Sequence, residues 1–285
     1  MADAHGDAAE RAVPRIYGAS ELGVLSLTAP GDIHPRVEYV GGELFVGLDV
    51  DGAAITQGQA EALGRDFREI VAGAVSRAGA LPAPVDGLLV IEDETIAASV
   101  LVSPARANDL ALRGTPVVFA LSRTRVAIVG AEDEEAVSRV LDLAEELYEA
   151  GGRLVSAHPI ALTGGAWAPF GWREAFPALG LRIERVLRLF SVRAYEVQGA
   201  VLQRPDVHIA DPKLHVRDDG VTLTFAAWPK GTATLLPVVD NVMIADPSGS
   251  LSVATMDQFL DAAGDAVVRT GLSPLRYFVP GQAPR

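Results

Sequence analysis

Residues 114–152 read GTPVVFALSRTRVAIVGAEDEEAVSRVLDLAEELYEAGG, and this stretch decides the fold that we expect for the chain. Two β-favouring runs, 117–121 and 125–129, are separated by the short segment 122–124, which is the spacing of a β-hairpin. Apolar residues then recur at intervals of three and four and share one helix face: Val137, Val140, Leu141, Ala144, Leu147 and Tyr148. Gly151 suits the left-handed conformation that ends a helix. The stretch therefore predicts strand, turn, strand and helix.

The predicted helix begins with four consecutive acidic residues, 132–135. The exposed amides of a first helical turn favour negative charge, so we interpret this run as a helix start. A cation site is the alternative interpretation of the same residues.

Composition narrows the class of protein. The chain has 285 residues, is 49% hydrophobic and has a mean hydropathy of +0.24. This length suits one large domain or two ordinary ones. No apolar run approaches the roughly 18 residues of a membrane span. The first 15 residues lack the apolar core of a secretory signal, so we expect a poorly ordered lead-in over residues 1–30.

Charge and cysteine content exclude further classes. Net charge is −13 with a pI near 4.8, and the chain has no cluster of Lys and Arg, so we expect no nucleic-acid partner. Cysteine is absent, which excludes disulfides, thiol nucleophiles and cysteine-ligated metals. We expect a cytoplasmic location.

Between the lead-in and the central stretch, the pattern is mixed. Runs 36–40 and 43–50 flank a Gly-Gly pair and predict a hairpin. Thr56 and Gln59 have capping-box spacing and open a helix that we expect to continue to Gly79. Four further segments complete this part: a proline-rich linker at 80–84, a strand at 87–91, a run at 96–102 that suits either strand or helix, and a short helix after Ser103-Pro104.

Strands dominate the predicted C-terminal half. After one more possible strand within 154–162 and a short helix at 183–190, we expect strands at 193–202, 213–217, 221–228, 232–239 and 242–245. A late helix begins near Met256, and we expect Gly271 to end it. We predict an α+β protein of mixed, mostly antiparallel sheets with helices packed on one face. Its two subdomains cover 31–162 and 163–285.

One part of the chain, residues 87–155, resembles the YtpQ-like family of uncharacterised bacterial proteins. The resemblance consists of a strand, the Ser-x-Leu-Val patch at 99–102, a short helix and the Gly-x-x-Val-Val run at 114–118, followed by Arg125 and the turn VGAEDEE at 129–135. It implies a bacterial α+β protein and transfers no catalytic residue.

The polar segment 206–219, DVHIADPKLHVRDD, is the best candidate for chemistry. His208, Asp211 and His215 are the candidate catalytic residues, because imidazoles and carboxylates relay protons or bind metals. The alternative is a solvated loop at a sheet edge, in which Pro212 separates the two histidines. No catalytic motif accompanies these residues, and we predict no cofactor and no metal.

A loop rich in glycine and aromatic residues, TGGAWAPFGW at 163–172, holds the candidate interface residues Trp167, Phe170 and Trp172. Aromatic side chains anchor protein interfaces, and they also pin loops into a core.

Three functional hypotheses follow. The first is a non-enzymatic binding or assembly protein that self-associates or binds a protein partner through an exposed apolar patch near Trp167 and Trp172. The second is a small-molecule or metal-dependent enzyme that uses the His/Asp segment 206–218, and the third is a metal-binding regulatory module built on the same residues. We favour the first.

Overall fold

A computed structural model of the chain describes residues 10–28 and 34–281. These residues form two compact units: unit 1 comprises Met1–Glu21 and Ala29–Gly180, and unit 2 comprises Leu22–Thr28 and Leu181–Arg285. The expected boundary near residue 162 is therefore wrong. Apart from Leu22–Thr28, unit 2 begins only after Gly180, because the segment expected to be a boundary loop is held in a sheet of unit 1.

The expected lead-in is also partly wrong. Residues 13–28 form β1 (Val13–Gly18) and α2 (Ala19–Thr28), whereas residues 1–9 and 29–30 lie outside the described residues. Strand β1 is held by antiparallel pairing with β3 (Leu44–Val50) along its whole length. The second half of β1, Ile16 to Gly18, is buried.

The central stretch folds as the sequence predicts. Strands β6 (Pro116–Ser122) and β7 (Arg125–Gly130) form a hairpin, and α6 (Glu134–Glu149) packs on both. The side chain of Asp133 accepts a hydrogen bond from the Ala136 amide at 3.0 Å, and Gly151 has φ of 72°. The acidic run thus caps and begins a helix.

The hairpin is the centre of a five-stranded antiparallel sheet with the order β5-β7-β6-β8-β9. The outer strands are β5 (Leu88–Ile91), β8 (Ile160–Thr163) and β9 (Ala166–Pro169). Of the run 154–162, only the end belongs to a strand. The glycine-rich segment at 163–166 is the turn of the β8–β9 hairpin.

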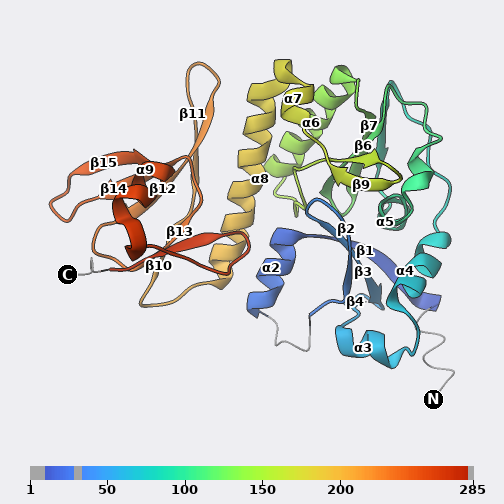
Figure 1. The fold of residues 1–285 in the computed structure, drawn as a ribbon, viewed down its shortest axis with the longest axis horizontal. Coiled ribbons are helices and arrows are strands. Elements are labelled where there is room, and N and C mark those ends of the chain that lie inside the picture. The colour runs from blue at the N-terminus through green and yellow to red at the C-terminus, as the bar shows by residue number, and fades with distance from the viewer. Residues whose placement is uncertain (1–9, 29–33, 282–285) are drawn as a thin grey trace. The chain divides into compact units, whose positions relative to one another are not determined.

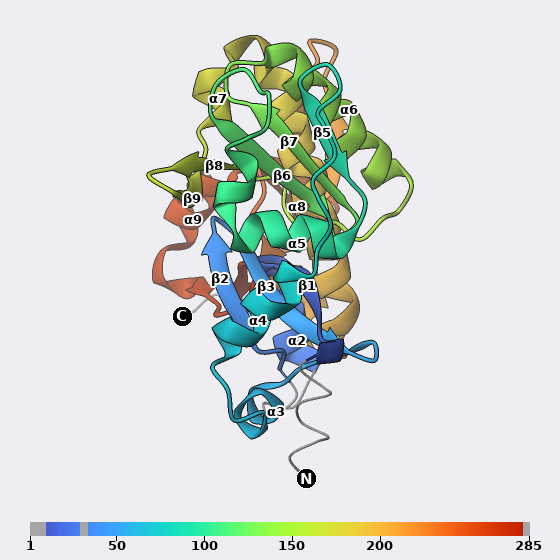
Figure 2. The ribbon, with the colours of Figure 1, turned by 90° about the vertical axis from the view of Figure 1, so that its right-hand side faces the viewer.

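A second sheet of unit 1 has the order β1-β3-β2, with β4 (Ala53–Ala54) paired to β3. Strand β2 (Val37–Gly41) and β3 form the predicted hairpin. Helices α4 (Phe67–Ser76) and α5 (Glu94–Val102) pack against β1. Figure 2 shows α5 between the strands of the two sheets, and one hydrophobic core joins them.

The helix expected from Thr56 to Gly79 is divided in two. The capping box at Thr56 is present and begins α3 (Gln57–Ala62), but Gly64 has φ of 64° and interrupts the helix. Asp66 then caps α4 by accepting a hydrogen bond from the Arg68 amide at 2.7 Å. Residues 96–102, which suited either strand or helix, belong to α5. Pro104–Ala107 form a single 3₁₀ turn, and Ser103 makes no side-chain cap.

Unit 2 contains the largest error of the sequence prediction. Helix α8 spans Gly180–Val201, so the strand expected at 193–202 is wrong. Buried positions continue beyond Phe190 at helical spacing, at Tyr195, Gln198 and Gly199. The β-branched and aromatic residues of this segment favour strand locally, and packing overrides that preference.

Two four-stranded sheets form the rest of unit 2. One has the order β10-β13-β17-β16, with strands His208–Ile209, Thr234–Pro237, Arg276–Val279 and Val268–Arg269. The other has the order β11-β12-β14-β15, with strands Lys213–Val216, Thr222–Pro229, Asn241–Ala245 and Leu251–Thr255. Helix α9 (Met256–Ala263) follows β15 and packs on it (Figure 1).

Strands β15, β16 and β17 are not predicted from the sequence, and the late helix ends at Gly264 rather than at the predicted Gly271. The fold class is nevertheless α+β with mostly antiparallel sheets, as predicted. Within the described residues, the helices are all too short or too polar to span a lipid bilayer.

Candidate functional site

The structure does not bring the candidate catalytic residues together. His208 lies in β10 and His215 in β11, which belong to different sheets of unit 2, and both side chains are exposed. Asp211 is also exposed, between the two strands. Among residues 10–28 and 34–281, no group of three or more His, Asp or Glu side chains is placed to hold a metal ion.

The aromatic residues expected at an interface lie inside unit 1. Trp167 is 6% exposed, and its Nε1 donates to the carbonyl oxygen of Leu101 at 3.0 Å. Trp172 is buried and packs its ring at 5.3 Å from that of Phe119, while Phe170 is half-buried beside Phe176. The exposed apolar patch expected near Trp167 and Trp172 is therefore absent from these positions.

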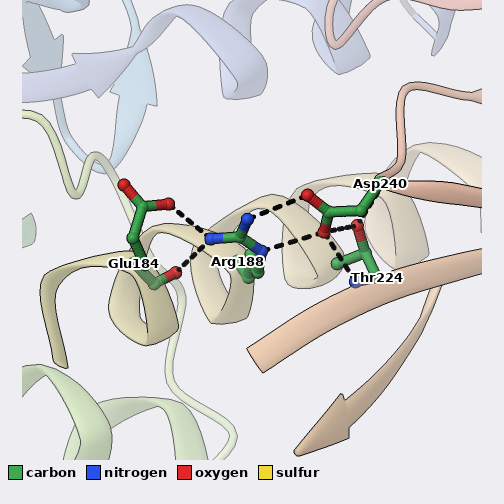
Figure 3. Close-up of polar contacts among 4 residues, drawn as sticks. All are labelled: Glu184, Arg188, Thr224 and Asp240. Atoms are coloured by element: carbon green, nitrogen blue, oxygen red, sulfur yellow. Dashed lines mark hydrogen bonds and ion pairs between the residues drawn. The ribbon is translucent and has the colours of Figure 1, made fainter. Parts of the chain in front are cut away.

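A network of charges in unit 2 joins α8 to the β11–β15 sheet (Figure 3). Arg188 binds both carboxylate oxygens of Asp240, at 2.9 and 2.8 Å, and also contacts Glu184 one turn earlier. Thr224 donates to Asp240 from its amide and its hydroxyl, at 2.7 and 2.8 Å. Burial alone would raise the pKa of Asp240, but hydrogen bonds from Arg188 and Thr224 lower it below the ordinary value. Every group here has a partner, so the network links elements and leaves no base free for catalysis.

A second polar group lies in unit 1 around β1. Arg15 contacts Asp49 of β3, and Arg123 contacts Glu21 of α2. Both guanidinium groups lie over the ring of Tyr17, at 5.7 and 5.3 Å from its centroid. Burial raises the pKa of Tyr17. Because opposite charges are paired here, the group fastens β1 to its neighbours.

Burial disfavours the charged form of two carboxylates beside this group, Glu21 and Glu94. Glu94, at the start of α5, accepts a weak hydrogen bond from the Ile16 amide at 3.4 Å. Burial raises the pKa of Glu94 and the pKa of Glu21 above their ordinary values, despite the nearby Arg15. Perturbed carboxyl groups are typical of functional sites and of structural ion pairs alike. Here their pairing favours the structural role.

A hollow of about 350 Å³ lies in unit 1 beside α3 and the start of α4. Glu38 in its lining binds Arg36 at 2.8 Å and Arg68 at 2.9 Å. Three carboxylates and three guanidinium groups line the hollow in all, so its lining has no net charge that would favour a ligand of either sign.

The most unusual surface of unit 2 is one face of the β11–β15 sheet. Cross-strand partners share a face of a sheet, so the register assigns residues to the two sides. One side is packed: Thr222, Thr224, Ala226 and Val242 are buried, and the last two belong to the core that includes α9. We call the other side the open face. Its apolar residues are Leu223, Phe225, Ala227, Met243, Ala245, Leu251 and Val253.

None of these seven open-face residues is buried, and none belongs to the core on the opposite side. Leu251 and Val253 of the edge strand β15 are 67% and 59% exposed. An antiparallel sheet that meets water on one side normally carries polar residues there. This surface cannot be predicted without β15, although the alternation of Leu251 and Val253 before the capping box at Thr255 is a usable signal for that strand.

Comparison of the chain with protein-family models, with curated proteins and with solved structures returns no match.

Proposed function

We propose that this protein is a non-enzymatic binding or assembly protein that acts through protein–protein contacts, and that the open face is its contact surface. The observation that carries the proposal is a continuous row of apolar side chains that are half-buried on β12 and β14 and exposed at Ala227 and on β15, opposite a packed core. Contiguous exposed apolar surface of this kind marks interaction sites in soluble proteins.

The second hypothesis, a small-molecule or metal-dependent enzyme at 206–218, gains no support from the structure. His208 and His215 lie in different sheets, and no other residue that the structure describes completes a metal-binding group with them. The proposal keeps the cytoplasmic location expected from the sequence, which cell fractionation tests.

The first test is to place a charge on the open face. Val253→Asp puts a carboxylate on an exposed strand position, where it does not disturb the core. Peptides that bind the full chain are selected from a random library, and light scattering after size exclusion measures self-association. We expect Val253→Asp to weaken the binding or the self-association that is found by about tenfold or more.

Val268→Asp is the matched control, because Val268 is 55% exposed on β16, in the other sheet of unit 2. It should bind as the unmodified chain does. The proposed function would be contradicted if Val253→Asp bound the selected peptides as tightly as the unmodified chain does. It would also be contradicted if the unmodified chain were a monomer and selected no peptide from the library.

A further inference from the structure

The open face is bordered on one side by basic residues. Lys213 lies opposite Phe225 in the β11–β12 register, and His215 lies opposite Leu223. The His215 ring also meets the Phe225 ring edge-on, with centroids 6.1 Å apart. Arg217 follows two residues later, at the end of the strand. Strand β11 is an edge strand, so this basic row runs along one margin of the apolar surface.

This row contrasts with the composition of the whole chain. The protein has 37 acidic residues against 24 Lys and Arg, and only two of those are lysines, Lys213 and Lys230. No strand position of the open face is acidic. The surface is therefore apolar at its centre and basic at one edge on an otherwise acidic protein.

Of the two cations in the basic row, Arg217 forms an ion pair within the described residues and Lys213 does not. Arg217 has a partner in Asp219, at 2.9 Å and with both side chains about half exposed. Lys213 makes no ion pair with any residue that the structure describes. A partner that covers the open face removes water from Lys213, and a cation that loses water without gaining a counter-charge opposes binding.

A second copy of the chain does not supply that counter-charge. In a face-to-face contact between two open faces, Lys213 meets apolar residues or the same basic row, because the open face contains no acidic strand position. Like charges placed against one another in an interface are unfavourable. A face-to-face dimer therefore leaves Lys213 without a counter-charge, which favours a different protein as the source of the carboxylates.

We propose, on the basis of the proposed function, that the open face binds an amphipathic helix of a protein partner whose apolar stripe is flanked by acidic residues. A helix is about 10 Å wide and strands lie about 5 Å apart. A helix laid along β12 and β14 therefore brings its flank over β11. Its apolar stripe covers Leu223, Phe225 and Met243, and its Asp and Glu residues reach Lys213 and Arg217.

Three synthetic helical peptides test this inference. Each has the same stripe of Leu and Ala, and the flank carries Glu, Gln or Lys. Binding of the labelled peptides to the full chain is measured by fluorescence anisotropy at low and high salt. We expect the Glu peptide to bind at least about tenfold more tightly than the Lys peptide, and we expect this preference to shrink at high salt.

Lys213→Glu should abolish or reverse the preference, while Lys230→Glu, the same charge change at the other lysine, should leave it intact. Lys230 follows β12 and pairs with Asp246. Equal binding of the three peptides, or a preference unchanged by Lys213→Glu, overturns the acidic partner. The proposed function still stands in that case if Val253→Asp weakens all three peptides. If Val253→Asp weakens none of them, or none binds, the proposed function fails as well.

Discussion

Arg276 shows how one residue holds unit 2 together. Its side chain is completely buried, and its Nε donates to Oε1 of Gln198 at 2.7 Å. Its terminal nitrogens donate to the carbonyl oxygens of Ala210, Leu235 and Tyr195, at 2.7 to 3.1 Å. One guanidinium thereby ties α8 to β13 and to the segment after β10. A buried cation is tolerated when its donors are satisfied in this way.

Arg276→Met should destabilise unit 2 by about 3 kcal/mol, because buried acceptors that lose their donor each cost about 1–3 kcal/mol. The measurement is urea unfolding followed by tryptophan fluorescence in a Trp167→Phe, Trp172→Phe background, which retains only Trp228 of unit 2. Arg269→Met, at an exposed position of β16, should change stability by less than about 0.5 kcal/mol. Similar losses for both variants would contradict the role of Arg276.

Two glycines of unit 1 give a matched pair of opposite effects. Gly73 lies within α4, and a Cβ added there meets nothing within 4 Å. Gly130 ends β7, and a Cβ there would lie 2.0 Å from the carbonyl oxygen of Arg113. Gly73→Ala should stabilise unit 1 by about 0.5–1 kcal/mol, and Gly130→Ala should destabilise it by more than about 1 kcal/mol. Urea unfolding of a Trp228→Phe background, which retains only the tryptophans of unit 1, measures both.

At the scale of elements, prediction succeeded where local signals agree with packing. The hairpin and helix of 114–152 combine strand propensity, turn spacing, an acidic helix start and a terminal glycine. The failures have local causes. The segment 193–201 contains residues that favour strands, yet its buried positions follow helical spacing, and Gly64 divides a pattern that otherwise continues across it.

The candidate site was harder to predict because it depends on pairing between distant strands. Lys213 becomes part of the open face through its register with Phe225, and Val253 through its register with Met243. The local sequence of a strand does not predict which face of its sheet packs against other elements of the fold. Arg276 is a similar case, because an arginine in a strand is expected to point to water.

At the scale of the whole molecule, the two units should respond to acid in opposite ways. Burial raises the pKa of Glu21 and the pKa of Glu94 above the ordinary value of 4.5. As pH falls, these two carboxylates are therefore protonated at a higher pH in the folded protein than in the unfolded chain. Stability from such groups is greatest below the unfolded pKa and is lost as pH rises through the folded pKa. Unit 1 should therefore gain stability as pH falls from neutral toward 4.5. In unit 2, Asp240 has a pKa below the ordinary 3.8, so its contribution should be lost as pH falls below that value.

Urea unfolding from neutral pH to below 3.8 tests both signs. The Trp228→Phe background reports unit 1, and a background with Trp167→Phe and Trp172→Phe reports unit 2. Glu94→Gln should reduce the gain of unit 1, and Asp240→Asn should weaken the loss of unit 2. If the free energies of unfolding of the two units changed with pH in the same direction, the opposite roles of Glu94 and Asp240 would be contradicted.

The discontinuity of unit 2 has a consequence for how the protein is made. Residues 22–28 leave the ribosome early, yet they belong to a unit whose other part starts at residue 181, so 152 residues (29 to 180) are synthesised in between. Within unit 2, Gly23 lies so close to Ser273 that an added Cβ would be 2.2 Å from the Ser273 carbonyl oxygen. The segment 22–28 therefore finds this neighbour only after residue 273 has been synthesised. A fragment that starts at residue 181 lacks this segment and should be recovered from cells in lower yield than the same fragment supplied with residues 22–28 through a linker.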